Sequence, residues 1–408
     1  MLGNVMVGQS GGPTSVINAS LVGVFKTARD CGCKTVYGMR NGIEGLLEER
    51  YVDLSNYIKN DLDIELLKRT PSSFLGTCRY KLPSADIAPD VYEKIFAILK
   101  RLEVKYFFYI GGNDSMDTIM QLSVFAEKIG SDIRFIGVPK TIDNDLALTD
   151  HTPGYGSAAK YIATAMKEII RDAKTYPNDS VTVVEIMGRN AGWLTAATYL
   201  SRAEDCTGPD LIYLPEVTFD HERFLSQISE IKKQNKAVIV AVSEGVKTAD
   251  GRYVCEVNRK NNITDAFGHK LLGGTALYLS DFLTENLGIK SRGIVLSTLQ
   301  RCASHLVSRR DITEAFMAGA DAMVAALGGE TGKMIVFNRI SNAPYSIVTN
   351  ICDIKKIANK EKCVPTEWIV RDGTYVSHEF DTYARPLIIG ELSPFMVDGL
   401  PRHLFIDD

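Results

Sequence analysis

The sequence predicts an α/β fold in which parallel strands alternate with helices. Three short apolar runs, 5–7, 106–110 and 133–138, each end in a turn that is rich in glycine or polar residues. The first two turns lead into segments with helical periodicity, 16–28 and 116–129. Strand, turn and helix in this order are typical of doubly wound sheets, which bind ligands at the carboxyl ends of their strands. We therefore expect two Rossmann-like, doubly wound lobes that face each other across a cleft.

Composition fits a globular protein of this class. The chain has 408 residues, of which 45% are hydrophobic and 24% charged, and its net charge is −4. This balance gives no reason to expect binding to nucleic acid or to an anionic membrane. Its apolar runs are too short to span a bilayer, its start resembles a strand rather than a signal peptide, and its eight cysteines lack paired metal spacing. We expect a cytoplasmic protein with reduced thiols.

The remaining elements extend the same alternation. Before the third run we expect a strand at 35–37 and a helix at 90–102. Beyond residue 145 we expect a second series, with helices at 158–174, 265–287 and 313–327 and strands at 181–186, 211–214, 237–242, 293–297 and 334–337. In this series His269 is best explained by a helix-capping or packing role, and His305 could be structural or functional. From about residue 341 the pattern is irregular and contains five prolines, which indicates a C-terminal extension.

The segment Pro139-Lys140-Thr141-Ile142-Asp143-Asn144-Asp145 has the highest density of reactive groups. Helix capping explains one aspartate after a strand, but not two beside a lysine. A carboxylate can act as a base or bind a metal, and an ammonium suits an anionic substrate. Because Lys140 would keep Asp143 ionised, Asp143 is the candidate base. This segment predicts a phosphate-handling active site.

Other loops offer the remaining parts of such a site. Gly11-Gly12 and Gly111-Gly112 lie in strand-to-helix turns, where backbone N–H groups can cradle phosphate. Positive charge comes from Arg79, Lys81, Arg189 and Arg301. Three polar loops at carboxyl ends of strands favour one shared ligand cleft.

Together, these motifs resemble those of the phosphofructokinase family from Gly11 to about Arg310. Gly111-Gly112-Asn113-Asp114-Ser115 and the 139–145 segment resemble the pyrophosphate-dependent branch, because ATP-dependent members have glycine where Asp114 and Lys140 stand. Met187-Gly188-Arg189, Ser243-Glu244-Gly245 and Gln300-Arg301 resemble the sugar-phosphate motifs. The Asp114 carboxylate would fill the space of the ATP α-phosphate with like charge, and Lys140 would stabilise the leaving phosphate.

The resemblance implies transfer of a phosphoryl group from diphosphate to the C1 hydroxyl of fructose 6-phosphate, with Mg²⁺ as cofactor. It implies catalytic roles for Asp143, Lys140 and Asp114, and metal binding by Asn113 and Asp145. The implied donor-binding residues are Gly11, Gly12, Arg79, Lys81, Gly112 and Ser115. The implied sugar-phosphate residues are Thr141, Ile142, Asp143, Met187, Gly188, Arg189, Glu244, Arg301 and Arg310 (or Arg309).

Two departures from the family pattern are visible. Asn113 replaces an aspartate that is associated with magnesium, and 178–181 lacks an arginine that would reach a neighbouring subunit. Sedoheptulose 7-phosphate as acceptor and a non-catalytic regulatory subunit are the alternative functions. The resemblance also implies a homodimer or homotetramer. We expect residues 1–146 to form the donor lobe, completed by a segment within 251–300. We expect 147–250 to form the sugar-phosphate lobe, completed by 301–340. Residues 341–408 should form the C-terminal extension.

Overall fold

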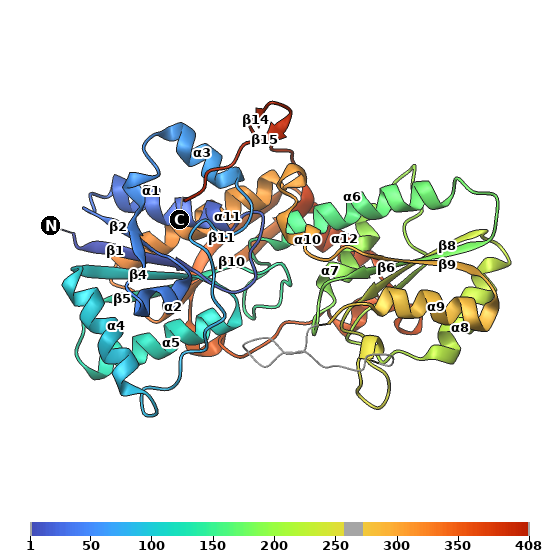
Figure 1. Cartoon of the computed structure of the whole chain (residues 1–408), viewed down its shortest axis with the longest axis horizontal. Coiled ribbons are helices and arrows are strands. Elements are labelled where there is room, and N and C mark those ends of the chain that lie inside the picture. Colours follow the sequence, from blue (N-terminus) through green and yellow to red (C-terminus); the bar gives the residue numbers. More distant parts are fainter. Residues whose placement is uncertain (1, 257–271, 407–408) are drawn as a thin grey trace.

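The computed structural model describes residues 2–256 and 272–406. His269 and the first part of the predicted 265–287 helix lie outside these ranges. Two α/β lobes lie side by side along the long axis of the molecule (Figure 1). The prediction of an α/β fold with parallel sheets is confirmed.

The first lobe is built on a seven-stranded sheet with the order β11-β10-β5-β4-β1-β2-β3. Its five central strands run parallel, and the edge strands β11 and β3 are antiparallel to their neighbours. In chain order the strands are β1 (Asn4–Gln9), β2 (Val36–Met39), β3 (Tyr51–Asp53), β4 (Val104–Gly111), β5 (Arg134–Pro139), β10 (Lys333–Asn342) and β11 (Tyr345–Asp353). β1, β4 and β5 contain the three apolar runs that predict the fold.

Helices cover both faces of this sheet. One face packs against α1 (Ile17–Asp30), α3 (Asp61–Arg69) and α11 (Arg309–Leu327), and the other against α2 (Gly42–Leu47), α4 (Pro89–Arg101) and α5 (Asn113–Lys128). Glycine allows α1 and α11 to approach closely. A Cβ atom on Gly319 would lie 2.0 Å from the carbonyl oxygen of Ser20, and one on Gly23 would lie 2.1 Å from that of Phe316. This contact fixes α11 to the first lobe.

The second lobe contains a four-stranded parallel sheet with the order β7-β8-β6-β9. Its strands are β6 (Ser180–Ile186), β7 (Leu211–Tyr213), β8 (Ala237–Ser243) and β9 (Lys290–Val295). One face packs against α6 (Tyr155–Ala173) and α7 (Trp193–Ala196), and the other against α8 (His221–Lys232) and α9 (Thr275–Leu287). The short α10 (Leu299–Cys302) follows β9 and leads back toward α11 (Figure 1).

The structure reverses a prediction about how the chain crosses between the lobes: each of two segments completes the lobe opposite to the one expected. The segment within 251–300 was expected to complete the first lobe, but β9 pairs with β6 in the second sheet. The segment 301–340 was expected to complete the second lobe, but β10 pairs with β5 in the first. Periodicity identifies a strand without identifying its partner, so the crossings could not be obtained from the pattern.

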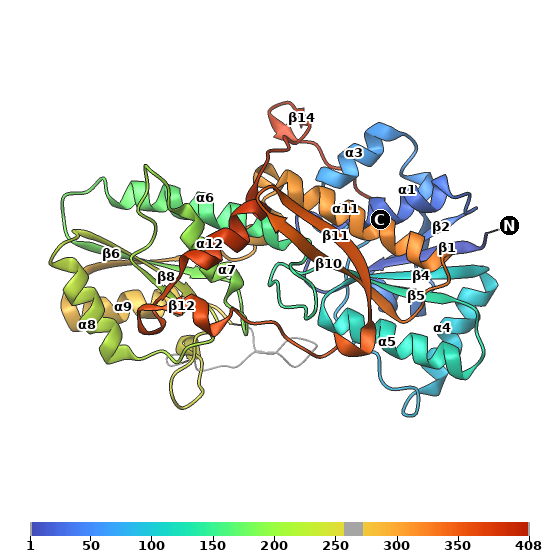
Figure 2. The same cartoon turned by 180° about the vertical axis from the view of Figure 1, so that it is seen from behind.

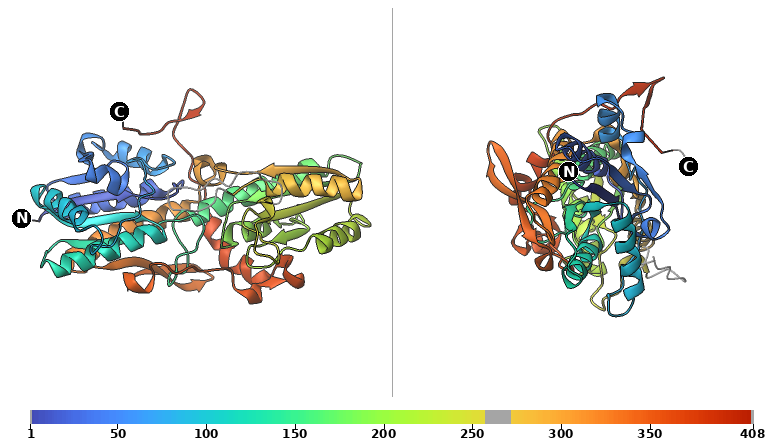
Figure 3. Two further views of the ribbon diagram at one scale, coloured as in Figure 1. Left: turned by 60° about the horizontal axis from the view of Figure 1, so that its bottom comes forward. Right: turned by 90° about the vertical axis from the view of Figure 1, so that its left-hand side faces the viewer.

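The C-terminal segment belongs to both lobes. After β11 it crosses to the second lobe, where β12 (Ile369–Val370), β13 (Tyr375–Val376) and α12 (His378–Ala384) pack. It then forms a hairpin of β14 (Met396–Val397) and β15 (Leu400–Pro401), which projects from the body of the molecule (Figure 3). Finally it returns to the first lobe, where the Leu404 N–H donates a hydrogen bond to Thr70 Oγ1 at 2.9 Å. The extension therefore joins the lobes.

Within residues 2–256 and 272–406, no helix combines the length and apolar character that crossing a membrane requires.

Candidate active site

A polar cavity of about 660 Å³ lies between the lobes. It is lined by loops at the carboxyl ends of β1, β4 and β5 in the first sheet and of β6 and β8 in the second. The lining residues are Ser10, Gly11, Gly12, Pro13, Arg79, Lys81, Gly112, Asn113, Asp114, Ser115, Lys140, Thr141, Ile142, Asp143, Asp145, Met187, Arg189, Asn190, Ala191, Glu244, Arg301, Asn359 and Glu361. Loops from both lobes therefore meet in one cleft.

This cavity brings together all the predicted site residues except Gly188 and Arg310. Gly188 lies at its edge, where its N–H donates a hydrogen bond to Glu244 Oε1 at 3.3 Å. Arg310 instead stacks on Tyr345, with its Cζ atom 4.1 Å from the ring centroid. Its neighbour Arg309 is exposed and donates a hydrogen bond to the Glu391 carbonyl at 2.9 Å. The first turn of α11 thus directs neither arginine into the cavity.

Lys140 is buried at the floor of the cavity, with 2% of its surface exposed. Its Nζ atom donates a 2.6 Å hydrogen bond to the Gly12 carbonyl, which ties the loop after β5 to the glycine turn after β1. Burial lowers the pKa of Lys140 to about 8, against the opposing effect of Asp143. Gly11, in the same turn, has a φ of 73°, a conformation that favours glycine.

Asp143 and Asp145 both line the cavity, and Asn144 between them is fully buried. Asn144 has a φ of 56°, in the left-handed region that asparagine tolerates better than most residues. Burial, reinforced by Glu244, raises the pKa of Asp143 to about 6. Burial and the neighbouring Asp143 raise the pKa of Asp145 to about 7. The two carboxylates therefore change charge close to neutral pH, as an acid–base site requires.

The α5 helix directs its N-terminus toward the cavity. Gly112 is its N-cap, and Asn113, Asp114 and Ser115 form its first turn. Backbone N–H groups at such a terminus can bind phosphate oxygens. Gly111 must lack a side chain here, since a Cβ atom would lie 1.9 Å from Ser115 Oγ.

The second lobe contributes a carboxylate and two arginines. Burial raises the pKa of Glu244, which accepts the hydrogen bond from Gly188. Arg189 and Arg301 line the cavity, and burial lowers the pKa of Arg301. Gln300 Oε1 accepts a 3.1 Å hydrogen bond from the Met187 N–H, so two of the predicted sugar motifs are in contact.

Sequence reasoning missed the contribution of the C-terminal segment. Asn359 and Glu361 line the cavity, and Glu361 Oε1 accepts a 2.9 Å hydrogen bond from Asn190. Both lie more than 200 positions beyond Asp143, in a stretch without a recognisable motif. His305 is exposed and does not line the cavity.

Comparison with known proteins places this geometry in context. The phosphofructokinase family profile matches residues 4–326. The chain is 38% identical over 403 residues to pyrophosphate–fructose 6-phosphate 1-phosphotransferase of Halomonas elongata, covering 98% of this chain and 95% of that protein. It is 40% identical over 405 residues to the enzyme of the same name from Methylococcus capsulatus, again covering 98% and 95%. The crystal structure of a pyrophosphate-dependent phosphofructokinase from Nitrosospira multiformis superimposes with a TM-score of 0.89 at 36% identity, covering 99% of this chain and 96% of that one.

Proposed function

The chain belongs to the phosphofructokinase family, and on that premise we propose that it is a pyrophosphate-dependent 6-phosphofructokinase of glycolysis and gluconeogenesis. In this reaction the C1 hydroxyl oxygen of fructose 6-phosphate attacks the terminal phosphorus of diphosphate. The bond to the leaving phosphate breaks and the hydroxyl proton passes to the protein. The products are fructose 1,6-bisphosphate and phosphate. The reaction is reversible because diphosphate and fructose 1,6-bisphosphate, the phosphoryl donors of the two directions, are comparable in energy.

The observation that carries the proposal is that Lys140 and Asp114 line the same cavity as Asp143. The Asp114 carboxylate at the start of α5 would repel the additional phosphate of ATP, because both groups are negatively charged. The buried Lys140 ammonium supplies positive charge in a site of low dielectric constant, where charge develops on the leaving phosphate. These two residues together favour diphosphate over ATP.

Asp143 is the proposed base. With its pKa raised to about 6, it is ionised at neutral pH and still basic enough to accept the hydroxyl proton. We assign the donor to Gly11, Gly12, Arg79, Lys81, Gly112 and Ser115. We assign the sugar phosphate to Thr141, Ile142, Met187, Gly188, Arg189, Glu244 and Arg301, so that the donor lies against the first lobe and the sugar phosphate contacts both lobes across the cleft.

The residues present fit a divalent cation. Asn113 Oδ1 is buried and accepts no hydrogen bond from the described part of the chain, and Asp145 lines the same cavity. We propose that these two residues hold Mg²⁺ with help from diphosphate oxygens, because Mg²⁺ is usually bound by few protein ligands together with substrate phosphates. When bound, the ion would neutralise charge on the donor.

Turnover by the purified protein tests the proposal. Formation of fructose 1,6-bisphosphate would be measured with diphosphate and with ATP, with and without Mg²⁺. We expect turnover with diphosphate and Mg²⁺. Turnover with ATP but not with diphosphate would overturn the donor assignment. No turnover with either donor would favour a regulatory subunit.

The acceptor requires its own comparison. Sedoheptulose 7-phosphate presents the same C1 hydroxyl and a terminal phosphate, so the residues of the cleft are compatible with it. We propose fructose 6-phosphate because relatives that match this chain over nearly its full length are named for that acceptor. A higher kcat/KM for sedoheptulose 7-phosphate would reassign the acceptor.

We further propose a homo-oligomer, dimer or tetramer, located in the cytoplasm. Large apolar side chains of the C-terminal segment are exposed: 71% for Leu400 and 71% for Phe405. Such exposure favours contact with another surface. Light scattering on the purified protein would give the molar mass, and a monomer at micromolar concentration would reject this assembly.

A further inference from the structure

The C-terminal segment passes directly beneath the catalytic loop, defined here as residues 139–152. The Lys362 N–H donates a 2.7 Å hydrogen bond to the carbonyl of Asp145. Glu361 forms an isolated antiparallel bridge with Leu146. The segment reaches this point after β11 and continues to β12 in the second lobe (Figure 2). It is therefore in backbone contact with the loop that carries Asp143.

The Lys362 side chain makes three contacts with this loop. Its Nζ atom donates to the carbonyl oxygen of Asp150 at 2.7 Å, to that of Thr149 at 3.1 Å and to Asn144 Oδ1 at 3.4 Å. An ammonium group has three hydrogens to donate, so all three are used within residues 144–150. The ammonium also lies 5.2 Å from the centroid of the Trp193 ring, which covers it from the second lobe.

Lys362 remains a donor at neutral pH. Burial lowers the pKa of its ammonium to about 8, while Asp150 and Asp145 act in the opposite direction. The three hydrogen bonds are thus present under ordinary assay conditions.

Asn144 is the point at which these contacts meet the catalytic residues. Its Nδ2 atom donates to the Tyr383 hydroxyl at 2.8 Å, and its Oδ1 accepts from the Thr152 N–H at 3.1 Å. Tyr383, in α12, donates in turn to the Asp150 carbonyl at 2.7 Å. Asn144 is therefore held with its side chain away from the cleft and its φ at 56°, which leaves Asp143 and Asp145 on the cleft side.

We propose that Lys362 and Tyr383 are positioning residues for phosphoryl transfer, which fix the Asp143–Asp145 loop from the side opposite the substrates. This inference rests on the proposed function, because it assigns to these residues an effect on the transfer step. It also gives the C-terminal extension a role in catalysis. Neither residue lines the substrate cavity, so neither acts as a catalytic residue.

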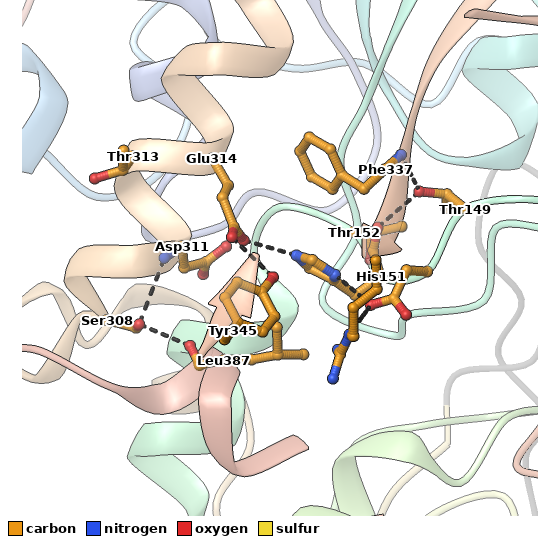
Figure 4. Close-up of polar contacts among 12 residues, drawn as sticks. Thr149, His151, Thr152, Ser308, Asp311, Thr313, Glu314, Phe337, Tyr345 and Leu387 are labelled. Carbon is orange, nitrogen blue, oxygen red and sulfur yellow. Dashed lines mark hydrogen bonds and ion pairs between the residues drawn. The ribbon is translucent and has the colours of Figure 1, made fainter. Parts of the chain in front are cut away.

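The rest of the loop is anchored independently of both residues. Thr149 Oγ1 accepts a 2.9 Å hydrogen bond from the Phe337 N–H, and His151 contacts Glu314 at 2.7 Å (Figure 4). Thr152 Oγ1 donates to the Thr141 carbonyl at 2.8 Å. Loss of the Lys362 ammonium should therefore loosen Asn144 and its flanking aspartates without unfolding the loop.

The consequence expected is a loss in rate rather than in binding. A displacement of about 1 Å at a reacting group can cost roughly 10²-fold in rate. Of the sugar-phosphate arginines, Arg189 follows β6 and Arg301 lies in α10, and neither is held by Lys362. A positioning role thus predicts a fall in kcat with little change in KM for fructose 6-phosphate.

The test compares Lys362→Met with Lys360→Met. Lys360 is an exposed lysine two positions earlier in the same segment, so its substitution removes the same charge without touching the loop. In the diphosphate assay we expect kcat of Lys362→Met to fall roughly 10²-fold, while fructose 6-phosphate affinity stays near that of the wild type. The thermal midpoint should fall, because three largely buried acceptors lose their donor. Lys360→Met should match the wild type.

A second variant keeps the inference testable if Lys362→Met does not fold. Tyr383→Phe removes one hydroxyl from a buried ring and should lower kcat by a smaller factor, again with KM retained. Wild-type kcat in Tyr383→Phe, or in a folded Lys362→Met, would overturn the inference. A wild-type protein that is itself inactive with diphosphate would instead contradict the proposed function, so the two failures are distinguishable.

Discussion

The Lys140 ammonium is bound to the Gly12 carbonyl at 2.6 Å, so the cation that marks the donor site is fixed by the opposite glycine turn. A lysine held in this way has lost its side-chain freedom before diphosphate arrives. Preorganised charge of this kind stabilises a transition state without reorganising during the reaction. The contact also depends on the turn, because Gly11 beside it has a φ of 73°.

Replacing Lys140 by methionine should lower kcat/KM for diphosphate by roughly 10²-fold, since one preorganised donor to the leaving phosphate is lost. In the wild type, the pKa of about 8 means that the ammonium is present below that pH and lost above it. Activity should therefore decline above about pH 8. A steady-state pH profile of both proteins checks this, and an unchanged kcat/KM in Lys140→Met would contradict the assigned role.

Replacing Asp143 by asparagine should lower kcat by roughly 10³-fold while fructose 6-phosphate still binds, because the amide keeps the shape of the base but cannot accept the proton. In the wild type, kcat should rise with pH through about 6 as the carboxylate ionises. Single-turnover assays and calorimetric titration with the sugar phosphate measure the two effects separately. Appreciable turnover by Asp143→Asn would remove Asp143 from the mechanism.

Replacing Asp114 should relax the choice of donor. Like charge at an interface discriminates strongly against the wrong partner, so Asp114→Ala should raise the ratio of ATP to diphosphate turnover by at least about tenfold. Asp114→Gly removes the same charge but also weakens the first turn of α5 by about 1 kcal/mol. If only the glycine variant gained ATP use, space rather than charge would be the determinant.

Much of the fold is predictable because its central strands have strong local signals. β1, β4 and β5 each contain an apolar run that ends in a glycine or charged turn, and this pattern is sufficient to locate them. β11 was missed, because it is an edge strand in a proline-containing stretch and its stability comes from pairing with β10. The strand predicted at 293–297 begins a few residues after the observed start of β9. The partner of β9, β6, lies more than 100 residues earlier in the chain, so local sequence could not identify it.

The grouping of the candidate site residues in one cavity was predictable for the same reason. Loops that follow apolar strands, such as 139–145 and 111–115, carry their chemistry within a few residues. Glu361, which lines the cavity, and Lys362, which lies behind the catalytic loop, could not be found in this way, since the C-terminal segment reaches this loop only by crossing between the lobes. Arg310 shows the converse limit: the family resemblance implied a phosphate contact for it, but its guanidinium stacks on Tyr345 of β11.

The buried His151 gives a prediction about stability rather than rate. Its Nδ1 atom lies 2.8 Å from Asp150 Oδ1. Its Nε2 atom lies 2.7 Å from Glu314 Oε2 (Figure 4). Burial alone would lower the pKa of the imidazole, but the two carboxylates outweigh it and raise the pKa above its usual value. Arg339 and Tyr345 contact the same carboxylates and complete the charged surroundings.

A raised pKa means that the folded protein binds this proton more tightly than the unfolded chain. The stabilisation is therefore fully present below about pH 6.5 and is lost as the pH rises through the folded-state value. His151→Gln should lower the free energy of unfolding by about 3 kcal/mol at pH 6 and by less at pH 9. Urea denaturation at both pH values measures this, with the exposed His378→Gln as the control. An equal loss at both pH values would show that His151 is held as a neutral ring, with its carboxylate partners sharing the proton.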